Sequence, residues 1–164
     1  MASRRQDRRG PAWALVLGSW AIGSACVAEA SIEPVPDAEV VDLLERDCGF
    51  SACHGQGGAA GGLDLSPVIS GALPPAEALV DVVACQTDLP LVAPGDPDRS
   101  WLLRKVDPST WDEGRVAAEP HAQPPRAGCP EGGASMGMPL GSEGMDPADV
   151  DALRRWIATQ DGAP

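Results

Sequence analysis

The sequence is poor in aromatic and basic side chains. Its 164 residues include no tyrosine and one phenylalanine, and Lys105 is the single lysine. Few aromatic residues make a small apolar core, so such a chain gains stability from a covalent cross-link or a bound apolar group. The formal net charge of −12 makes nucleic acid and anionic membrane surfaces poor partners.

The sequence also lacks the usual signatures of enzymes. It contains no glycine-rich phosphate loop, no serine nucleophile elbow and no H-E-x-x-H zinc motif. Only two histidines are present, His54 and His121, and the cysteines and histidines do not have the paired spacing of a zinc site. We therefore expect no catalytic residues and no enzymatic activity.

The N-terminus has the composition of an export signal. Four arginines between residues 4 and 9 precede an uncharged run over residues 10–28. Processing sites are available after Ala30 and, in the lipoprotein-type sequence "GSAC", at Cys26. We predict a signal peptide over residues 1–30, a short linker over 31–36 and one domain over 37–164. The protein is then expected in the periplasm or cell envelope, with membrane contact only through a lipid anchor at Cys26.

Four helices are predicted, over residues 36–49, 74–85, 96–106 and 145–162, because apolar residues recur there at helical spacing. We expect Asp37 to cap the first helix and Cys48 to lie on its buried face. In the last helix, Asp146 is the expected cap and Pro147 the first helical residue. The connecting segments 54–67 and 107–135 are rich in glycine and proline, and no strand pattern is visible. We therefore predict an all-α domain with long Gly/Pro-rich loops.

The stretch "CGFSACHG", residues 48–55, has the residues of a covalent haem attachment site with altered spacing. The usual signature is C-x-x-C-H, whereas four residues separate Cys48 from Cys53, and His54 follows directly. Both thiols can reach haem vinyl groups if residues 49–52 bulge outward, which Gly49 makes easier because glycine tolerates most backbone angles. The alternative is a Cys48–Cys53 disulfide followed by a histidine, His54, that binds no metal.

The segment "GASMGMPLG", residues 133–141, offers a sixth ligand to a haem iron. Met136 and Met138 point to opposite sides of an extended chain, so only one of them can face the haem. Pro139 favours an extended backbone at Met138, and we predict that Met138 is the ligand. Ligation by histidine and methionine suits electron transfer.

The order of five motifs resembles that of cytochrome c-like domains of bacterial envelope proteins, particularly the planctomycete-type cytochrome c group. These motifs are "CHG" at 53–55, "GGLDLS" at 61–66, "APGDPDRSWLLRKV" at 93–106, "MPLG" at 138–141 and "LRRWIATQDGAP" at 153–164. The resemblance implies a small cytochrome c-like helical domain in which the N- and C-terminal helices pack together. It implies haem c as the cofactor, with Cys48 and Cys53 as thioether donors, His54 as the proximal ligand and Met138 as the distal ligand. The expected function is electron transfer to a redox partner, for which a basic docking surface would suit this acidic chain.

Cys85 and Cys129 are not needed by haem chemistry. We predict that they form a disulfide that ties residue 85 to the segment before Met138. Disulfides persist in oxidising compartments, which agrees with the export signal.

Three other functions remain open. One is a haemless lipoprotein or envelope binding module with Cys48–Cys53 and Cys85–Cys129 bridges. Another is copper binding, for which the soft or imidazole ligands would be His54, His121, Met136, Met138 and Met145. A haem peroxidase is the third, and it would need His121 as an acid–base group on a distal side that Met138 leaves open.

Overall fold

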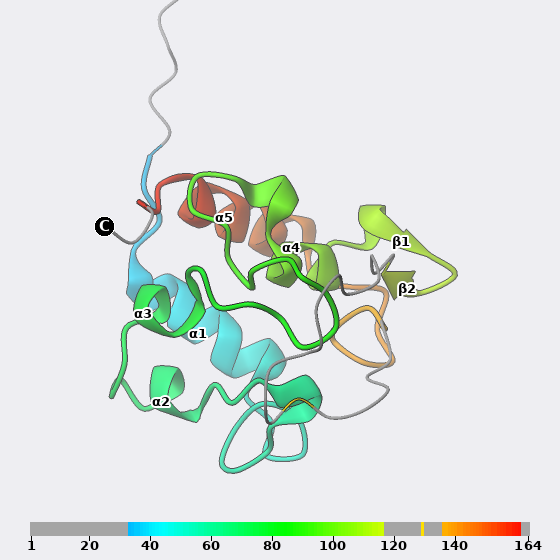
Figure 1. Cartoon of the computed structure of the whole chain (residues 1–164), viewed down its shortest axis with the longest axis horizontal. Coiled ribbons are helices and arrows are strands. Elements are labelled where there is room, and N and C mark those ends of the chain that lie inside the picture. Colours follow the sequence, from blue (N-terminus) through cyan, green and yellow to red (C-terminus); the bar gives the residue numbers. More distant parts are fainter. Residues whose placement is uncertain (1–32, 117–128, 130–135, 162–164) are drawn as a thin grey trace, which may run out of the picture. The chain divides into compact units, whose positions relative to one another are not determined.

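The computed structural model describes residues 33–116, 129 and 136–161, all within one compact unit (Figure 1). The predicted export signal, Cys26 and His121 lie outside these residues. The α-helices are α1 (Asp37–Cys48), α2 (Ser66–Ile69), α3 (Pro75–Leu79), α4 (Trp101–Val106) and α5 (Pro147–Ala158). Short 3-10 helices span Ala60–Gly62, Pro97–Arg99 and Pro108–Thr110, and the strands are β1 (Trp111–Asp112) and β2 (Arg115–Val116).

The prediction of an all-α domain is wrong, because β1 and β2 form a two-stranded antiparallel sheet. Between them, Glu113 has a φ of 48° and Gly114 a φ of 74°. Two successive residues with positive φ make the turn that joins short antiparallel strands without splaying them. Strands of two residues are too short to produce an alternating pattern, so the sequence carries no sign of this sheet. The fold of the described residues is therefore mixed.

The helix predictions differ in accuracy at their ends. Asp146 caps α5 as expected, since its carboxylate accepts a hydrogen bond of 2.8 Å from the Ala148 backbone N–H, and Pro147 begins the helix. The predicted cap at Asp37 is wrong, because Pro36 occupies the cap position and Asp37 is the first helical residue. The Asp37 carboxylate instead accepts a 2.8 Å hydrogen bond from Trp156 Nε1. This bond joins the beginning of α1 to α5, and the two helices pack against each other, as the resemblance implies.

The predicted helix over residues 74–85 ends early, at Leu79. Val80 is extended and forms a parallel bridge with Val92, while Val83 forms an antiparallel bridge with Pro90. The branched side chains of Val80, Val82 and Val83 favour an extended backbone over a helix. This segment therefore pairs with Val92 and Pro90, although its apolar residues are spaced as in a helix.

Cys85 and Cys129 form the predicted disulfide, which closes a sequence separation of 44 residues. The core between the helices contains Trp101 of α4 and Trp156 of α5, each 1% exposed, and Cys48 lies on the buried face of α1 as expected. In the part of the chain that the structure describes, no helix has the length and apolar character to cross a membrane.

Candidate functional site

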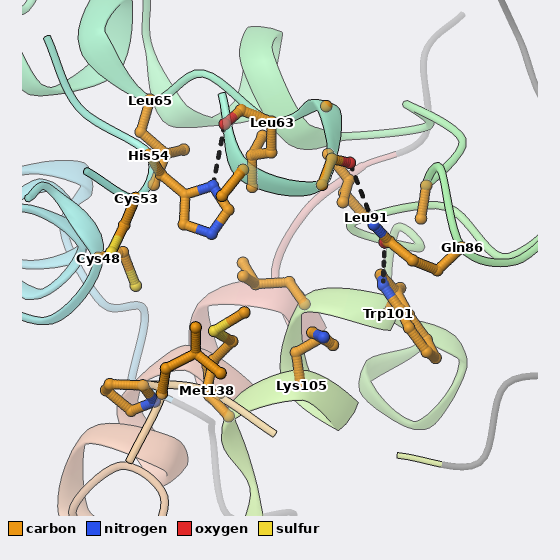
Figure 2. Close-up of a pocket in the computed structure, with 18 of the residues that line it drawn as sticks. Cys48, Cys53, His54, Leu63, Leu65, Gln86, Leu91, Trp101, Lys105 and Met138 are labelled. Carbon is orange, nitrogen blue, oxygen red and sulfur yellow. Dashed lines mark hydrogen bonds between the residues drawn. The ribbon is translucent and has the colours of Figure 1, made fainter. Parts of the chain in front are cut away.

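A largely apolar cavity of about 430 Å³ lies between the loop that follows α1, the helix α4 and the segment around Met138 (Figure 2). Its volume falls in the range of about 300–1,000 Å³ that is typical of small-molecule sites. The apolar part of the wall includes the side chains of Leu63, Leu65, Leu91, Leu102 and Val106. The four residues expected to hold a haem, Cys48, Cys53, His54 and Met138, all line this cavity.

The loop after α1 folds back on itself and brings the two thiols together. The Cys53 N–H donates to the Phe50 carbonyl at 2.8 Å, and the His54 N–H donates to the Cys48 carbonyl at 3.3 Å. Phe50 is pushed outward and is 63% exposed. The two extra residues of the motif are thus accommodated in an outward bulge, and Figure 2 shows Cys48 and Cys53 next to each other at one side of the cavity.

The glycines of this loop allow two backbone segments to lie close together, rather than providing unusual backbone angles. Gly49 has an ordinary φ of −75°, so the expected use of its backbone freedom is not observed. A Cβ atom on Gly55 would lie 2.0 Å from the Gly49 carbonyl oxygen, well inside contact distance. The glycine that follows His54 therefore lets the chain close the loop against the end of α1.

The His54 ring is oriented by a hydrogen bond from Nδ1 to the Leu63 carbonyl oxygen at 2.9 Å. Because a carbonyl oxygen can only accept, Nδ1 carries a proton, and in the neutral ring Nε2 is then the nitrogen with the lone pair. Figure 2 shows the ring extending into the cavity. A second hydrogen bond, from the Leu65 N–H to the His54 carbonyl at 2.6 Å, holds the backbone of the same residue. An imidazole held through one nitrogen with the other nitrogen free is the usual arrangement of a metal-binding histidine.

Met138 lies across the cavity from His54 (Figure 2). Its backbone N–H donates to the Lys105 carbonyl of α4 at 2.6 Å, and the Gly137 N–H donates to the Gly114 carbonyl at 3.0 Å. Gly137 packs so closely on Trp111 that a Cβ atom would lie 2.5 Å from its ring. Met136 does not line the cavity.

Neither thiol at the cavity is bonded to the other. Cys48 is 8% exposed, and its burial, assisted by the negative charge of Asp47, raises its pKa to about 12. Cys48 therefore stays protonated at neutral pH. The Cys48–Cys53 bridge of the haemless alternative is not present.

The copper-binding candidates are not gathered in one place. Met145 is 5% exposed within the hydrophobic core and does not line the cavity, and His121 lies outside the described residues. Of the members of that set that the structure describes, His54 and Met138 line the cavity, and Met136 and Met145 do not. Over residues 33–116, 129 and 136–161, no group of three or more His, Cys, Asp or Glu side chains is arranged to hold a metal ion.

The sequence analysis did not identify a polar edge of the cavity formed by Gln86, Trp101 and Lys105. Trp101 Nε1 donates to Gln86 Oε1 at 3.2 Å, and Gln86 Nε2 donates to the Gly61 carbonyl at 3.1 Å. Lys105 Nζ donates to the Met136 carbonyl and lies 5.7 Å from the centre of the Trp101 ring. Burial lowers the pKa of Lys105 to about 8. A single lysine four residues after a tryptophan, on an otherwise apolar helix face, was the available signal in the sequence.

Comparison with family models, with curated proteins and with solved structures gives no match for this chain.

Proposed function

We propose that this protein is an exported c-type cytochrome that binds one haem c and transfers electrons. The observation that carries the proposal is the orientation of His54, whose Nε2 is left free to bind iron while Nδ1 is held by Leu63. Met138 faces it across the cavity, and two unbonded thiols lie at one side (Figure 2). Imidazole, thioether and paired thiols around an apolar cavity are the donor set that haem c requires.

Each residue has a defined part in this proposal. Cys48 and Cys53 would hold the porphyrin through thioether bonds, and His54 and Met138 would bind its iron. A bound haem would supply a one-electron couple between ferric and ferrous iron. The thioether of Met138 and the apolar wall, including Leu65 which is 1% exposed, would favour the ferrous form and raise the reduction potential. The same wall would exclude water from the site.

The proposed location is the periplasm or cell envelope, either in soluble form or with a lipid anchor at Cys26. The Cys85–Cys129 disulfide is compatible with such an oxidising compartment. The proposed partner is a redox protein with a basic docking surface, because a net charge of −12 attracts such a surface at long range. The rate of electron transfer between the two should then fall as ionic strength rises.

The first test is an absorption spectrum and an intact mass of the protein exported from a host with a cytochrome c maturation system. A Soret band with sharp reduced α and β bands, together with one added haem that survives denaturation, is expected. A colourless protein whose mass indicates two disulfides would overturn the proposal and leave a haemless envelope module.

Two matched pairs of variants assign the ligands. His54→Ala should abolish the haem spectrum, whereas His121→Ala, at the only other histidine, should retain it. Met138→Ala should keep the covalent haem but lower its reduction potential, because a sulfur ligand is lost. Met136→Ala is the control, since Met136 contacts Lys105 through its backbone carbonyl and does not line the cavity. Equal potentials in the two methionine variants would contradict the assignment of Met138.

A further inference from the structure

We infer that Lys105, at the polar edge of the cavity, binds a propionate carboxylate of the haem and so fixes which way round the porphyrin lies. The inference rests on the proposed function and deepens it. It assigns a role to the single lysine of the chain, which neither the attachment motif nor the axial ligands involve.

Lys105 is directed into the cavity by the periodicity of α4. Trp101, Leu102, Lys105 and Val106 line the cavity together, as expected for positions i, i+1, i+4 and i+5 on one helix face. The neighbouring Arg104 does not line it, and its Nε donates to the Asp98 carbonyl at 3.0 Å. Lys105 is therefore the cation on the cavity-facing side of α4.

The ammonium group of Lys105 has donors to spare. It carries three N–H groups, of which one is directed at the Met136 carbonyl. Among the described residues, the ion pairs are made by Arg46 and Arg154, and none involves Lys105. The other charged group on the cavity wall, Asp47, is paired with Arg46 at 2.7 Å. A partly buried cation without a carboxylate is costly, and an anionic group on the ligand would offset that cost.

The position of Lys105 relative to the thiols agrees with the substitution pattern of haem. The two vinyl groups sit on neighbouring pyrroles, and the two propionates sit on the other two pyrroles, at the opposite edge of the ring. Figure 2 shows Cys48 and Cys53 at one side of the cavity and Lys105, Trp101 and Gln86 at the other. Attachment of the vinyl groups at Cys48 and Cys53 therefore directs the propionates towards Lys105.

The neighbours of Lys105 suit a carboxylate. Gln86 Nε2 uses one N–H on the Gly61 carbonyl and has a second N–H available. The Gln86 side chain is itself held by Trp101 Nε1. The polar edge thus offers a carboxylate two donors, the ammonium group of Lys105 and the amide N–H of Gln86. Both side chains are already positioned by other hydrogen bonds.

The test compares two probes on the full mature chain prepared without haem: iron protoporphyrin and its dimethyl ester, in which both carboxylates are neutralised. Binding of each is followed by the Soret absorption. The unaltered protein should bind the free acid roughly tenfold or more tightly than the ester, as expected for a hydrogen bond between charged groups. Lys105→Met should bind both probes with about equal affinity.

Two controls separate charge from folding. Arg104→Met removes a neighbouring charge that does not line the cavity, and Lys105→Arg keeps a cation in place, so both should preserve the preference for the acid. The affinity of Lys105→Met for the ester reports whether its cavity is intact. A preference for the acid that persists in Lys105→Met, or its absence in the unaltered protein while both probes bind, overturns the inference but leaves the proposed function standing. Failure of the unaltered protein to bind either probe overturns both.

Discussion

The two sides of the cavity are built in different ways. On the side of His54, the stabilising contacts are local, since the hydrogen bonds of Cys53 and His54 are all made with residues 48–65. On the side of Met138, the contacts come from distant parts of the chain. Lys105 of α4 holds Met138, while Gly114 and Trp111 of the β-hairpin hold Gly137.

This difference predicts how substitutions elsewhere in the fold affect each side of the cavity. A local loop forms at low entropic cost and depends little on the rest of the fold. A segment held by distant elements loses its position when any of those elements moves. Changes in the described fold should therefore disturb Met138 before they disturb His54.

Removal of the disulfide should have the largest effect on this comparison. In Cys85→Ala/Cys129→Ala, the loss of a link across 44 residues should lower the free energy of unfolding by at most about 4 kcal/mol. Urea unfolding of the haem-free chain measures this loss. In the haem-loaded variant, we expect covalent haem to remain and the reduction potential to fall, since the link lies in the chain just before the Met138 segment. An unchanged unfolding midpoint would contradict this prediction.

Gly55→Ala should have the next largest effect, on the side of His54. The added Cβ would meet the Gly49 carbonyl at 2.0 Å, so the backbone of the loop must shift. Such overpacking costs about 1–3 kcal/mol, and we expect reduced incorporation of haem as well. Ser51→Ala is the control in the same loop, because Ser51 is exposed and its substitution should change stability by less than about 0.5 kcal/mol. Equal stability of the two variants would show that the loop does not need glycine at position 55.

Gly137→Ala should disturb the side of Met138 more mildly. Its Cβ would lie 2.5 Å from the ring of Trp111, which is only partly buried but whose Nε1 donates to the Arg104 carbonyl at 3.0 Å, so the ring must shift at a cost of about 1 kcal/mol. The reduction potential of the haem-loaded variant should fall while covalent attachment persists. A double-mutant cycle with Trp111→Leu isolates this contact, because Gly137→Ala should cost much less once the ring is gone. Additive effects would mean that the ring is not the obstacle.

The smallest effect is a difference in thiol reactivity that leaves stability unchanged. In the haem-free protein, Cys48 is buried with a pKa of about 12, whereas Cys53 is partly exposed. Since the thiolate is the reactive form, alkylation of Cys48 by iodoacetamide should be slow at pH 8 and rise about tenfold per pH unit below its pKa. Peptide mapping after timed alkylation should find Cys53 labelled first. Preferential labelling of Cys48 would mean that its side chain is not buried.

The candidate site was predictable to the extent that it is local. The adjacency of Cys53 and His54, and the closeness of Cys48 at the end of a helix, follow from a few neighbouring residues. The disulfide was predicted from the two cysteines left over, and the structure confirms it. The polar edge was missed because Gln86 joins Trp101 and Lys105, which lie four residues apart on α4, only through the packing of α4 on the loop that contains Gln86.

The fold shows the same division between local and distant causes. Amphipathic spacing and the cap at Asp146 placed the start of α5, although the helix ends at Ala158 rather than near residue 162, and the predicted start of α1 lies within one residue of the observed one. The valines after Leu79 are spaced as in a helix, and a helix was predicted there. In the structure Val80 and Val83 form bridges with Val92 and Pro90. The all-α prediction failed for a similar reason, since β1 and β2 are defined by a turn and a pairing partner rather than by a pattern.

The sequence by itself therefore determined the two long terminal helices and the chemistry of the loop that carries Cys53 and His54, because these depend on hydrogen bonds and spacing within a few turns of chain. Pro139 already favoured Met138 over Met136 in the sequence, whereas only the tertiary structure decided that Met138 lies across the cavity from His54 and that Lys105 stands at the opposite side from the thiols. Those positions are set by contacts with α4 and the β-hairpin, and no pattern in the neighbouring residues encodes contacts between distant segments.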